Sequence, residues 1–139
     1  MPESHVGVGG LSGDWQKNRK LHGGSDRAVC LFSMERIEAL VGEGHPIRPG
    51  AIGENVTVAG LEWERLRPGV RLRLGDGVLL EVTSFTTPCR TIAGAFADGR
   101  TGRVSQTLHP GWSRVYARVL VAGTVRVGDP VVLDAAPPR

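Results

Sequence analysis

The sequence has few of the features that mark exported, membrane-spanning or disulfide-linked proteins. Aromatic residues make up 5% of the 139 residues, and only two cysteines occur. No apolar stretch approaches the roughly 20 residues that a membrane-spanning helix requires. Residues 1–10 lack the basic start and long apolar core of a signal peptide. These absences predict a cytoplasmic protein that does not insert into a membrane.

The two cysteines, Cys30 and Cys89, cannot form the disulfide framework of a small secreted domain. They also form no closely spaced pair of the kind that binds zinc through thiolates. Each cysteine therefore has to be interpreted separately. Cys30 lies within the apolar run 28–32, which predicts a residue of the hydrophobic core.

The charges are scattered along the chain, although the formal net charge is +3. Arginines between positions 65 and 73 alternate with leucines, and only two lysines occur. A basic stripe interleaved with aromatic residues, which is typical of nucleic-acid-binding proteins, is missing. We therefore expect no nucleic-acid partner, but a mildly positive surface favours the capture of an anionic ligand.

The length fits a single domain over residues 1–139, with a core from about residue 9 to 133 and a flexible tail at 135–139. Twenty glycines and nine prolines separate short apolar runs, which indicates many turns and short strands. Regular helices between the strands are missing, so a parallel α/β sheet is not expected. The pattern predicts a mainly β fold: a β-barrel of short, mostly antiparallel strands with one or two short helices.

Individual elements follow from local patterns. Residues 34–41 have apolar positions at helical spacing, and Ser33 suits the N-cap of that helix. A second short helix is predicted at 90–96, whereas residues 1–24 look mostly irregular. The strand over 78–85 is apolar on both faces and is therefore expected to be central. The other predicted strands are 28–32, 55–58, 72–74 and 131–133, with a hairpin that joins 115–121 to 124–127.

Cys89 is the first candidate for chemistry, because it follows the predicted strand 78–85 directly. Strand ends are common positions for functional groups. Pro88 restricts the local backbone, and the neighbouring Arg90 is a cation that favours thiolate over thiol. A thiolate binds soft metals and carries sulfur. The alternative is that Cys89 is a small buried apolar residue.

A second candidate is the polar segment 22–27. Gly23 and Gly24 allow close approach of the backbone to a ligand and offer N–H groups to an anion. His22, Asp26 and Arg27 supply an acid–base group, a carboxylate and a set of donors. The same residues also suit an ordinary surface loop that precedes a strand.

A third candidate is Glu54 with Asn55, which follow a glycine and enter a predicted strand. A carboxylate beside an amide suits a pterin-like heterocycle, which presents both donors and acceptors. The alternative is a turn with a side-chain-to-backbone hydrogen bond, which local sequence favours slightly.

Taken in order, these segments resemble the MOSC domain, which is named for the C-terminal region of molybdenum cofactor sulfurases. The resemblance covers residues 9 to about 133. The matching segments are Gly10-Leu11-Ser12-Gly13-Asp14, His22-Gly23-Gly24 with Asp26 and Ala28-Val29, Pro49-Gly50 with Gly53-Glu54-Asn55, Pro88-Cys89, and Tyr116-Ala117-Arg118-Val119 with Gly123 and Gly128-Asp129.

The resemblance implies a β-barrel fold and a molybdenum cofactor, molybdopterin, with Cys89 as the metal ligand or as a sulfur carrier. It assigns the remaining pocket to His22, Gly23, Gly24, Asp26, Arg27, Glu54, Asn55 and Arg90. Pyridoxal phosphate is not expected, because the chain has no room for the aminotransferase-like domain of the sulfurases.

The resemblance leaves two functions open. One is a molybdenum-dependent oxidoreductase that reduces N-hydroxylated compounds with electrons from a protein donor. The other is a non-enzymatic module that carries the cofactor or a Cys89 persulfide to a sulfur-transfer partner. Family members also have a longer N-terminal stretch, whereas eight residues precede Gly9 here. We therefore expect either a missing barrel element or one supplied by a partner or a second subunit.

Overall fold

The computed structural model describes residues 5–8, 18–21, 29–48, 52, 54, 56–75, 77–88, 90–126 and 128–133. Its strands are β1 (His5–Val8), β2 (Asn18–Leu21), β3 (Val29–Ser33), β4 (Val56–Ala59), β5 (Arg71–Leu74), β6 (Val78–Phe85), β7 (Val115–Val121), β8 (Gly123–Arg126) and β9 (Val131–Leu133). Its helices are α1 (Met34–Gly42) and the 3₁₀ turns η2 (Trp63–Arg65), η3 (Arg90–Ala95) and η4 (Thr101–Val104).

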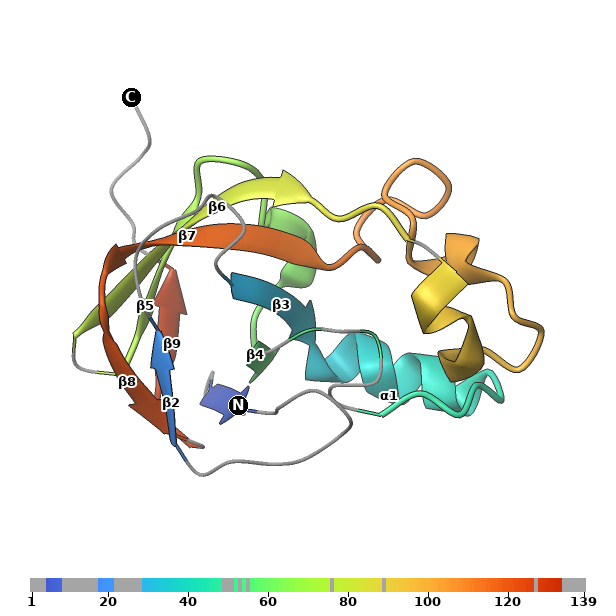
Figure 1. Ribbon diagram of the computed structural model, residues 1–139, viewed down its shortest axis with the longest axis horizontal. Helices are drawn as coiled ribbons and strands as arrows, with labels where there is room; N and C mark the ends of the chain where they lie inside the picture. The colour runs from blue at the N-terminus through green and yellow to red at the C-terminus, as the bar shows by residue number, and fades with distance from the viewer. Residues whose placement is uncertain are drawn as a thin grey trace.

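Among the described residues, seven strands form one sheet in the order β1-β4-β3-β7-β6-β5-β9, and β2 pairs with β8 in a second, two-stranded sheet. The large sheet curves into a nearly closed barrel shape, with α1 beside it (Figure 1). The mainly β fold predicted from the sequence is therefore confirmed. Strand pairing is antiparallel except between β3 and β4, which α1 connects.

Local sequence explains the limits of α1. The Ser33 hydroxyl oxygen accepts a hydrogen bond from the backbone N–H of Arg36 at 3.1 Å, as the predicted N-cap requires. Ile37 and Leu40 lie one turn apart and are both buried. The helix ends before Gly44, whose φ of 98° is a conformation that glycine adopts at little cost. The helix predicted at 34–41 is thus confirmed.

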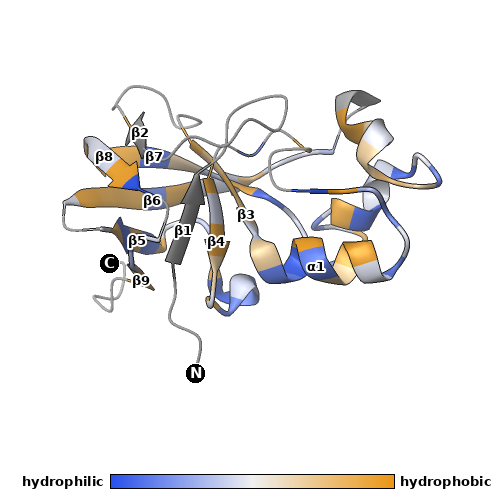
Figure 2. Cartoon of the chain, turned by 90° about the horizontal axis from the view of Figure 1, so that it is seen from below, coloured by the Kyte–Doolittle hydropathy of each residue, from blue (hydrophilic) through white to orange (hydrophobic). Residues whose placement is uncertain are grey.

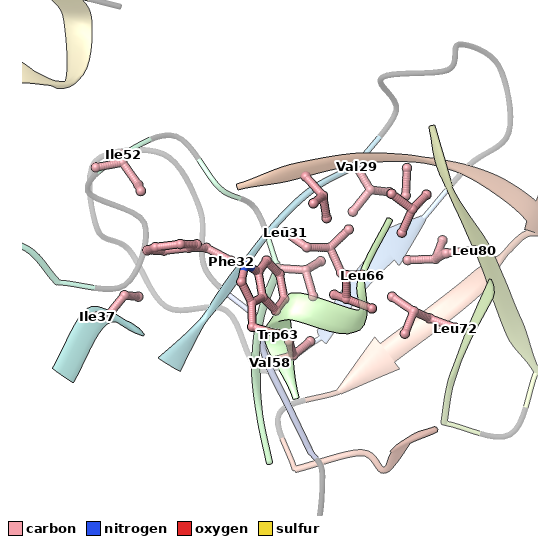
Figure 3. Packing of buried hydrophobic residues seen from close by; sticks show 14 of the residues in the cluster. Val29, Leu31, Phe32, Ile37, Ile52, Val58, Trp63, Leu66, Leu72 and Leu80 are labelled. Atoms are coloured by element: carbon pink, nitrogen blue, oxygen red, sulfur yellow. The ribbon is translucent and has the colours of Figure 1, made fainter. Parts of the chain in front are cut away.

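The strand β3 has buried side chains on both faces, because it separates two parts of the core. The barrel interior holds Val29, Leu31, Leu72 and Leu80 (Figure 3). On the other face, the Phe32 ring points toward Ile37 and Ile52 (Figure 3). Apolar residues accordingly run along β3, β4 and β6, whereas α1 shows both polar and apolar residues (Figure 2). The face that carries Phe32 is the face nearer to α1.

The segment between β6 and β7 packs beside α1 (Figure 1). The Nδ1 atom of His45 accepts a hydrogen bond from the Ala97 backbone N–H at 3.1 Å. Arg103 donates to both carboxylate oxygens of Glu43, at 2.9 and 2.7 Å. Its guanidinium also lies 3.9 Å from the centre of the Trp112 ring, in cation–π geometry. The short helix predicted at 90–96 corresponds to η3, a 3₁₀ turn.

The structure corrects two expectations about the strands. Within residues 1–24, which were expected to be mostly irregular, residues 5–8 form β1, which pairs with β4, and residues 18–21 form β2, which pairs with β8; the rest of this stretch lies outside the described residues. These pairings arise from strands distant in sequence, which a local pattern does not reveal. The chain therefore itself supplies a strand before Gly9. The predicted hairpin between 115–121 and 124–127 is also absent from the described pairings: β7 pairs with β3 and β6, and β8 pairs with β2.

The strand over residues 78–85 lies between β5 and β7, so its central position is confirmed. The strand was expected to be apolar on both faces, but fully buried and half-buried side chains alternate from Val78 to Val82. Only alternate residues face the barrel interior. No helix among the described residues is long and apolar enough to cross a membrane.

Candidate functional site

Most of the residues proposed from the sequence lie outside the described residues. These are Cys89, His22, Gly23, Gly24, Asp26, Arg27 and Asn55. Arg90 is described as the first residue of η3, and Glu54 is described with its side chain. In this described part of the chain, no group of three or more His, Cys, Asp or Glu residues is arranged to hold a metal ion. The structure thus describes the frame around the candidate site.

The segment that leads to Cys89 is fixed where the end of β6 lies beside the start of β7. Phe85 pairs with Val115 in the last register position between the two strands. One residue further, the Thr86 backbone N–H donates to the Arg114 carbonyl oxygen at 3.1 Å. The Ser113 hydroxyl lies 3.3 Å from the Thr86 carbonyl oxygen and 2.6 Å from that of Arg114. Residues 86–88 therefore leave the sheet from an anchored position.

The Arg114 side chain connects this strand end to the segment that leads to Glu54. The side chain is buried, with 6% of the residue exposed, and its Nη1 donates to the Ile52 carbonyl oxygen at 2.7 Å. Ile52 is fully buried and lies two residues before Glu54. A buried charge–dipole hydrogen bond of this kind is stronger than a neutral one. Arg114 thus contacts the segments that lead to two of the three groups of candidate residues.

The charged side chains of Glu54 and Arg114 both act on the Cys30 thiol. Burial raises the pKa of the Cys30 thiol to about 12, while the Arg114 cation opposes the rise and the Glu54 carboxylate adds to it. Both charged groups therefore lie close enough to act on the sulfur. Cys30 is 7% exposed, which confirms it as a core residue. With this pKa the thiol stays protonated at neutral pH, so it is poorly suited to act as a thiolate.

Polar side chains continue across the sheet from Cys30. Cys30 pairs with Tyr116 of β7, and Tyr116 pairs with Ser84 of β6. Side chains at paired positions point to the same face of a sheet, so these three residues share the face that carries Phe32. Tyr116 and Ser84 are half-buried. Polar side chains in a row on this face are consistent with a site there.

Sequence reasoning did not identify Ser84, Thr86, Ser113, Arg114 or Tyr116 as parts of this region. The available signal was weak: Ser84 interrupts an apolar strand, and Arg114 stands directly before another. Arginine is rarely buried unless it is paired, so nothing in the local sequence marked Arg114 as a buried residue.

Comparison with known proteins identifies the family of the chain. The family model of the MOSC domain matches residues 18–132. The chain is 35% identical over 121 residues to the protein YflK of Bacillus subtilis (strain 168), a match that covers 85% of this chain and 52% of YflK. It is 32% identical over 121 residues to a protein named reductase from Gibberella moniliformis (strain M3125 / FGSC 7600), covering 84% of this chain and 21% of that protein. The chain thus spans about half the length of YflK and a smaller part of the reductase.

A solved structure shares the fold over almost the whole chain. The crystal structure of YiiM from Geobacillus stearothermophilus superposes with a TM-score of 0.69 at 26% identity, covering 95% of this chain and 73% of YiiM. The match of the family model to most of the chain, together with this likeness, shows that the protein belongs to the MOSC domain family.

Proposed function

We propose that this protein binds the molybdenum cofactor, with Cys89 as the thiolate ligand of molybdenum. The observation that carries the proposal is the arrangement around Arg114, whose backbone and side chain hold the segments that lead to Cys89 and to Glu54. Both segments belong to the ordered motifs of the family. Functional groups on a rigid frame are held more accurately than groups on free loops.

The two cysteines differ in a way that supports Cys89. A metal-binding cysteine acts as a thiolate. Burial and the Glu54 carboxylate raise the pKa of Cys30 to about 12, and a metal at that position would have to displace a tightly held proton. Cys89 follows Pro88 at a strand end and precedes the cation Arg90. The proposal therefore assigns the ligand role to Cys89 alone.

Two described residues suit a pterin heterocycle. Glu54 is 2% exposed, and a buried carboxylate suits the N–H donors of a pterin ring. The Thr86 hydroxyl is buried and has no hydrogen-bond partner among the described residues. Leaving such a group unpaired is costly, and a bound cofactor could supply the missing partner. Glu54 and Thr86 would thus help to hold it, together with His22, Gly23, Gly24, Asp26, Arg27, Asn55 and Arg90.

We further propose that the protein with its bound cofactor is an oxidoreductase that reduces N-hydroxylated compounds. The cofactor would supply two-electron redox chemistry at molybdenum, and a protein donor would supply the electrons. The similarity to a protein named reductase supports this activity over that of a carrier. This chain's own contribution would be to bind the pterin, to present the Cys89 thiolate and to place the substrate beside it.

The test is the molybdenum and pterin content per chain after expression in a host that makes the cofactor. Wild-type protein should hold about one molybdenum per chain, and Cys89→Ser should lose it. Cys30→Ala is the matched control, because it removes the other cysteine and should retain the metal. Reductase turnover of an N-hydroxylated substrate is then measured with the loaded protein and a chemical electron donor.

Equal molybdenum content in Cys89→Ser and wild type would refute the ligand assignment. Wild-type protein without molybdenum or pterin would refute cofactor binding, and a sulfane-sulfur assay of Cys89 would then test the persulfide carrier. A loaded protein without turnover would leave cofactor binding in place and refute the reductase.

A further inference from the structure

We infer that Arg114 is a positioning residue that couples the segment before Glu54 to the segment before Cys89. The inference rests on the proposed function only in its consequence, which is slower release of the bound cofactor. The coupling itself depends on contacts within the described residues.

The contacts of Arg114 lead in two directions. Through its carbonyl oxygen, the residue accepts the Thr86 N–H at 3.1 Å. Through Nη1, it donates to the Ile52 carbonyl oxygen at 2.7 Å. Residues 52 and 86 are far apart in the sequence, and β3 and β7 separate β4 from β6 in the sheet. Arg114 therefore bridges segments that the ladder of sheet hydrogen bonds does not join directly.

The neighbouring Ser113 holds the side of this bridge that leads to Thr86. Its carbonyl oxygen accepts the Trp63 indole N–H at 2.8 Å, and its hydroxyl contacts the Thr86 carbonyl oxygen at 3.3 Å. Ser113 and Arg114 are 1% and 6% exposed. Buried hydrogen bonds hold their groups more firmly than exposed ones, because water does not compete for them. A displacement at residue 114 is thus transmitted to both segments.

The chemistry of the Arg114 side chain predicts different effects for different substitutions. A guanidinium spans the distance to Ile52 and keeps its charge when buried. Lysine keeps a positively charged donor group, whereas methionine keeps only the approximate length. The coupling therefore predicts a graded series in which Arg114→Lys retains much of the function and Arg114→Met loses it.

The first test is amide hydrogen exchange of the cofactor-free protein. In Arg114→Met, peptides that cover residues 46–54 and the amide of Thr86 should both exchange at least about tenfold faster, which corresponds to about 1.4 kcal/mol of local opening. Ser113→Ala should accelerate Thr86 and leave 46–54 unchanged. Amides in the pair β5–β6 serve as the internal reference. Faster exchange of 46–54 with an unchanged Thr86 would refute the coupling.

The second test is the rate of pterin release from loaded protein, well below the unfolding temperature. Release should be about tenfold faster from Arg114→Met and should return close to the wild-type rate in Arg114→Lys. Arg118→Met is the control, because it removes an exposed arginine from another part of β7. Arg118 pairs with Glu81 of β6. A lower unfolding temperature with an unchanged release rate would show a role in stability alone and would overturn the inference.

The two proposals fail in different ways. If wild-type protein holds no pterin, the proposed function fails, and hydrogen exchange alone decides whether Arg114 couples the two segments. If pterin is bound but neither exchange nor release responds to Arg114→Met, the coupling fails and the proposed function stands.

Discussion

The indole N–H of Trp63 donates to the carbonyl oxygen of Ser113 at 2.8 Å, inside the core. Trp63 is 4% exposed, and its ring meets the Phe32 ring edge-on at 5.9 Å between centroids. The residue therefore joins η2 to the start of β7 by a polar contact as well as by packing.

Trp63→Phe should lower the free energy of unfolding by about 1–3 kcal/mol, because it removes the only donor of that side chain and part of its packing volume. Urea unfolding followed by circular dichroism measures the change. Trp63→Ala should cost more, since it also removes the ring that packs on Phe32. An unchanged urea midpoint in Trp63→Phe would show that this hydrogen bond adds nothing to stability.

The turn between β5 and β6 offers a matched pair of glycines. Gly75 has φ of 61°, and a Cβ atom there would lie 2.9 Å from Oδ2 of Asp129. Gly77 has no atom within 4 Å of the same position and no positive φ. Gly75→Ala should therefore destabilise the fold by about 1–2 kcal/mol, whereas Gly77→Ala should be neutral or slightly stabilising. Thermal unfolding of both variants tests this, and equal effects would contradict it.

Stability at alkaline pH should depend on Cys30. Its pKa rises from 9.0 to about 12 in the fold, because burial disfavours the thiolate. A raised pKa means that the unfolded state loses the proton first, so the contribution of this thiol is complete below pH 9 and declines as the pH rises toward 12.

Cys30→Ala should therefore flatten the fall of unfolding free energy between about pH 9 and pH 11. The effect of Cys30→Ala is measured in protein that also carries Cys89→Ser, so that no other cysteine titrates. In the Cys89→Ser protein that retains Cys30, this thiol should also resist alkylation by iodoacetamide at pH 8 until the protein unfolds. Rapid alkylation of native protein would contradict the burial of the thiol.

Glu81 of β6 lies between two arginines of neighbouring strands. Arg118 donates to Oε1 at 2.8 Å from Nε, and Arg71 donates to Oε2 at 3.2 Å. Hydrogen bonding from Arg118 lowers the pKa of Glu81, burial opposes this, and Arg71 adds to it. With a lowered pKa, the stabilising effect is present above the ordinary value of 4.5 and disappears as the pH falls further.

Glu81→Gln should flatten the loss of stability on acidification and should cost no more than about 1 kcal/mol at neutral pH, because the arginines are largely solvated. The difference from wild type should shrink in 1 M salt, which screens exposed charges. Urea unfolding at several pH values measures both effects. A cost that does not depend on salt would indicate packing rather than charge.

The elements that sequence reasoning predicted correctly are those with local causes. Ser33 and the spacing of Ile37 and Leu40 specify α1 without reference to the rest of the chain. The apolar run of residues 78–85 likewise indicated a central strand. The strand at 18–21 could not be predicted in this way, because Asn18 and Lys20 favour β structure only through their pairing with β8.

The same distinction applies to the candidate site. Glu54 was identified through its place in an ordered set of motifs, and it proves to be buried. Arg114 belongs to no such motif, and only the folded chain brings its guanidinium to the Ile52 carbonyl oxygen. Long-range contacts of single side chains leave no pattern in a sequence, so this part of the frame could not be predicted.

The pairing of β2 with β8 has a consequence for synthesis of the protein. Residues near position 20 find their partners near position 125, whereas β5 and β6 are neighbours in the chain. Because a nascent chain emerges N-terminus first, β2 has no partner until translation is nearly complete. The β5–β6 hairpin can close much earlier. A ribosome that stalls before residue 123 would therefore hold a partly folded chain in which β2 is unpaired, the kind of species that chaperones recognise.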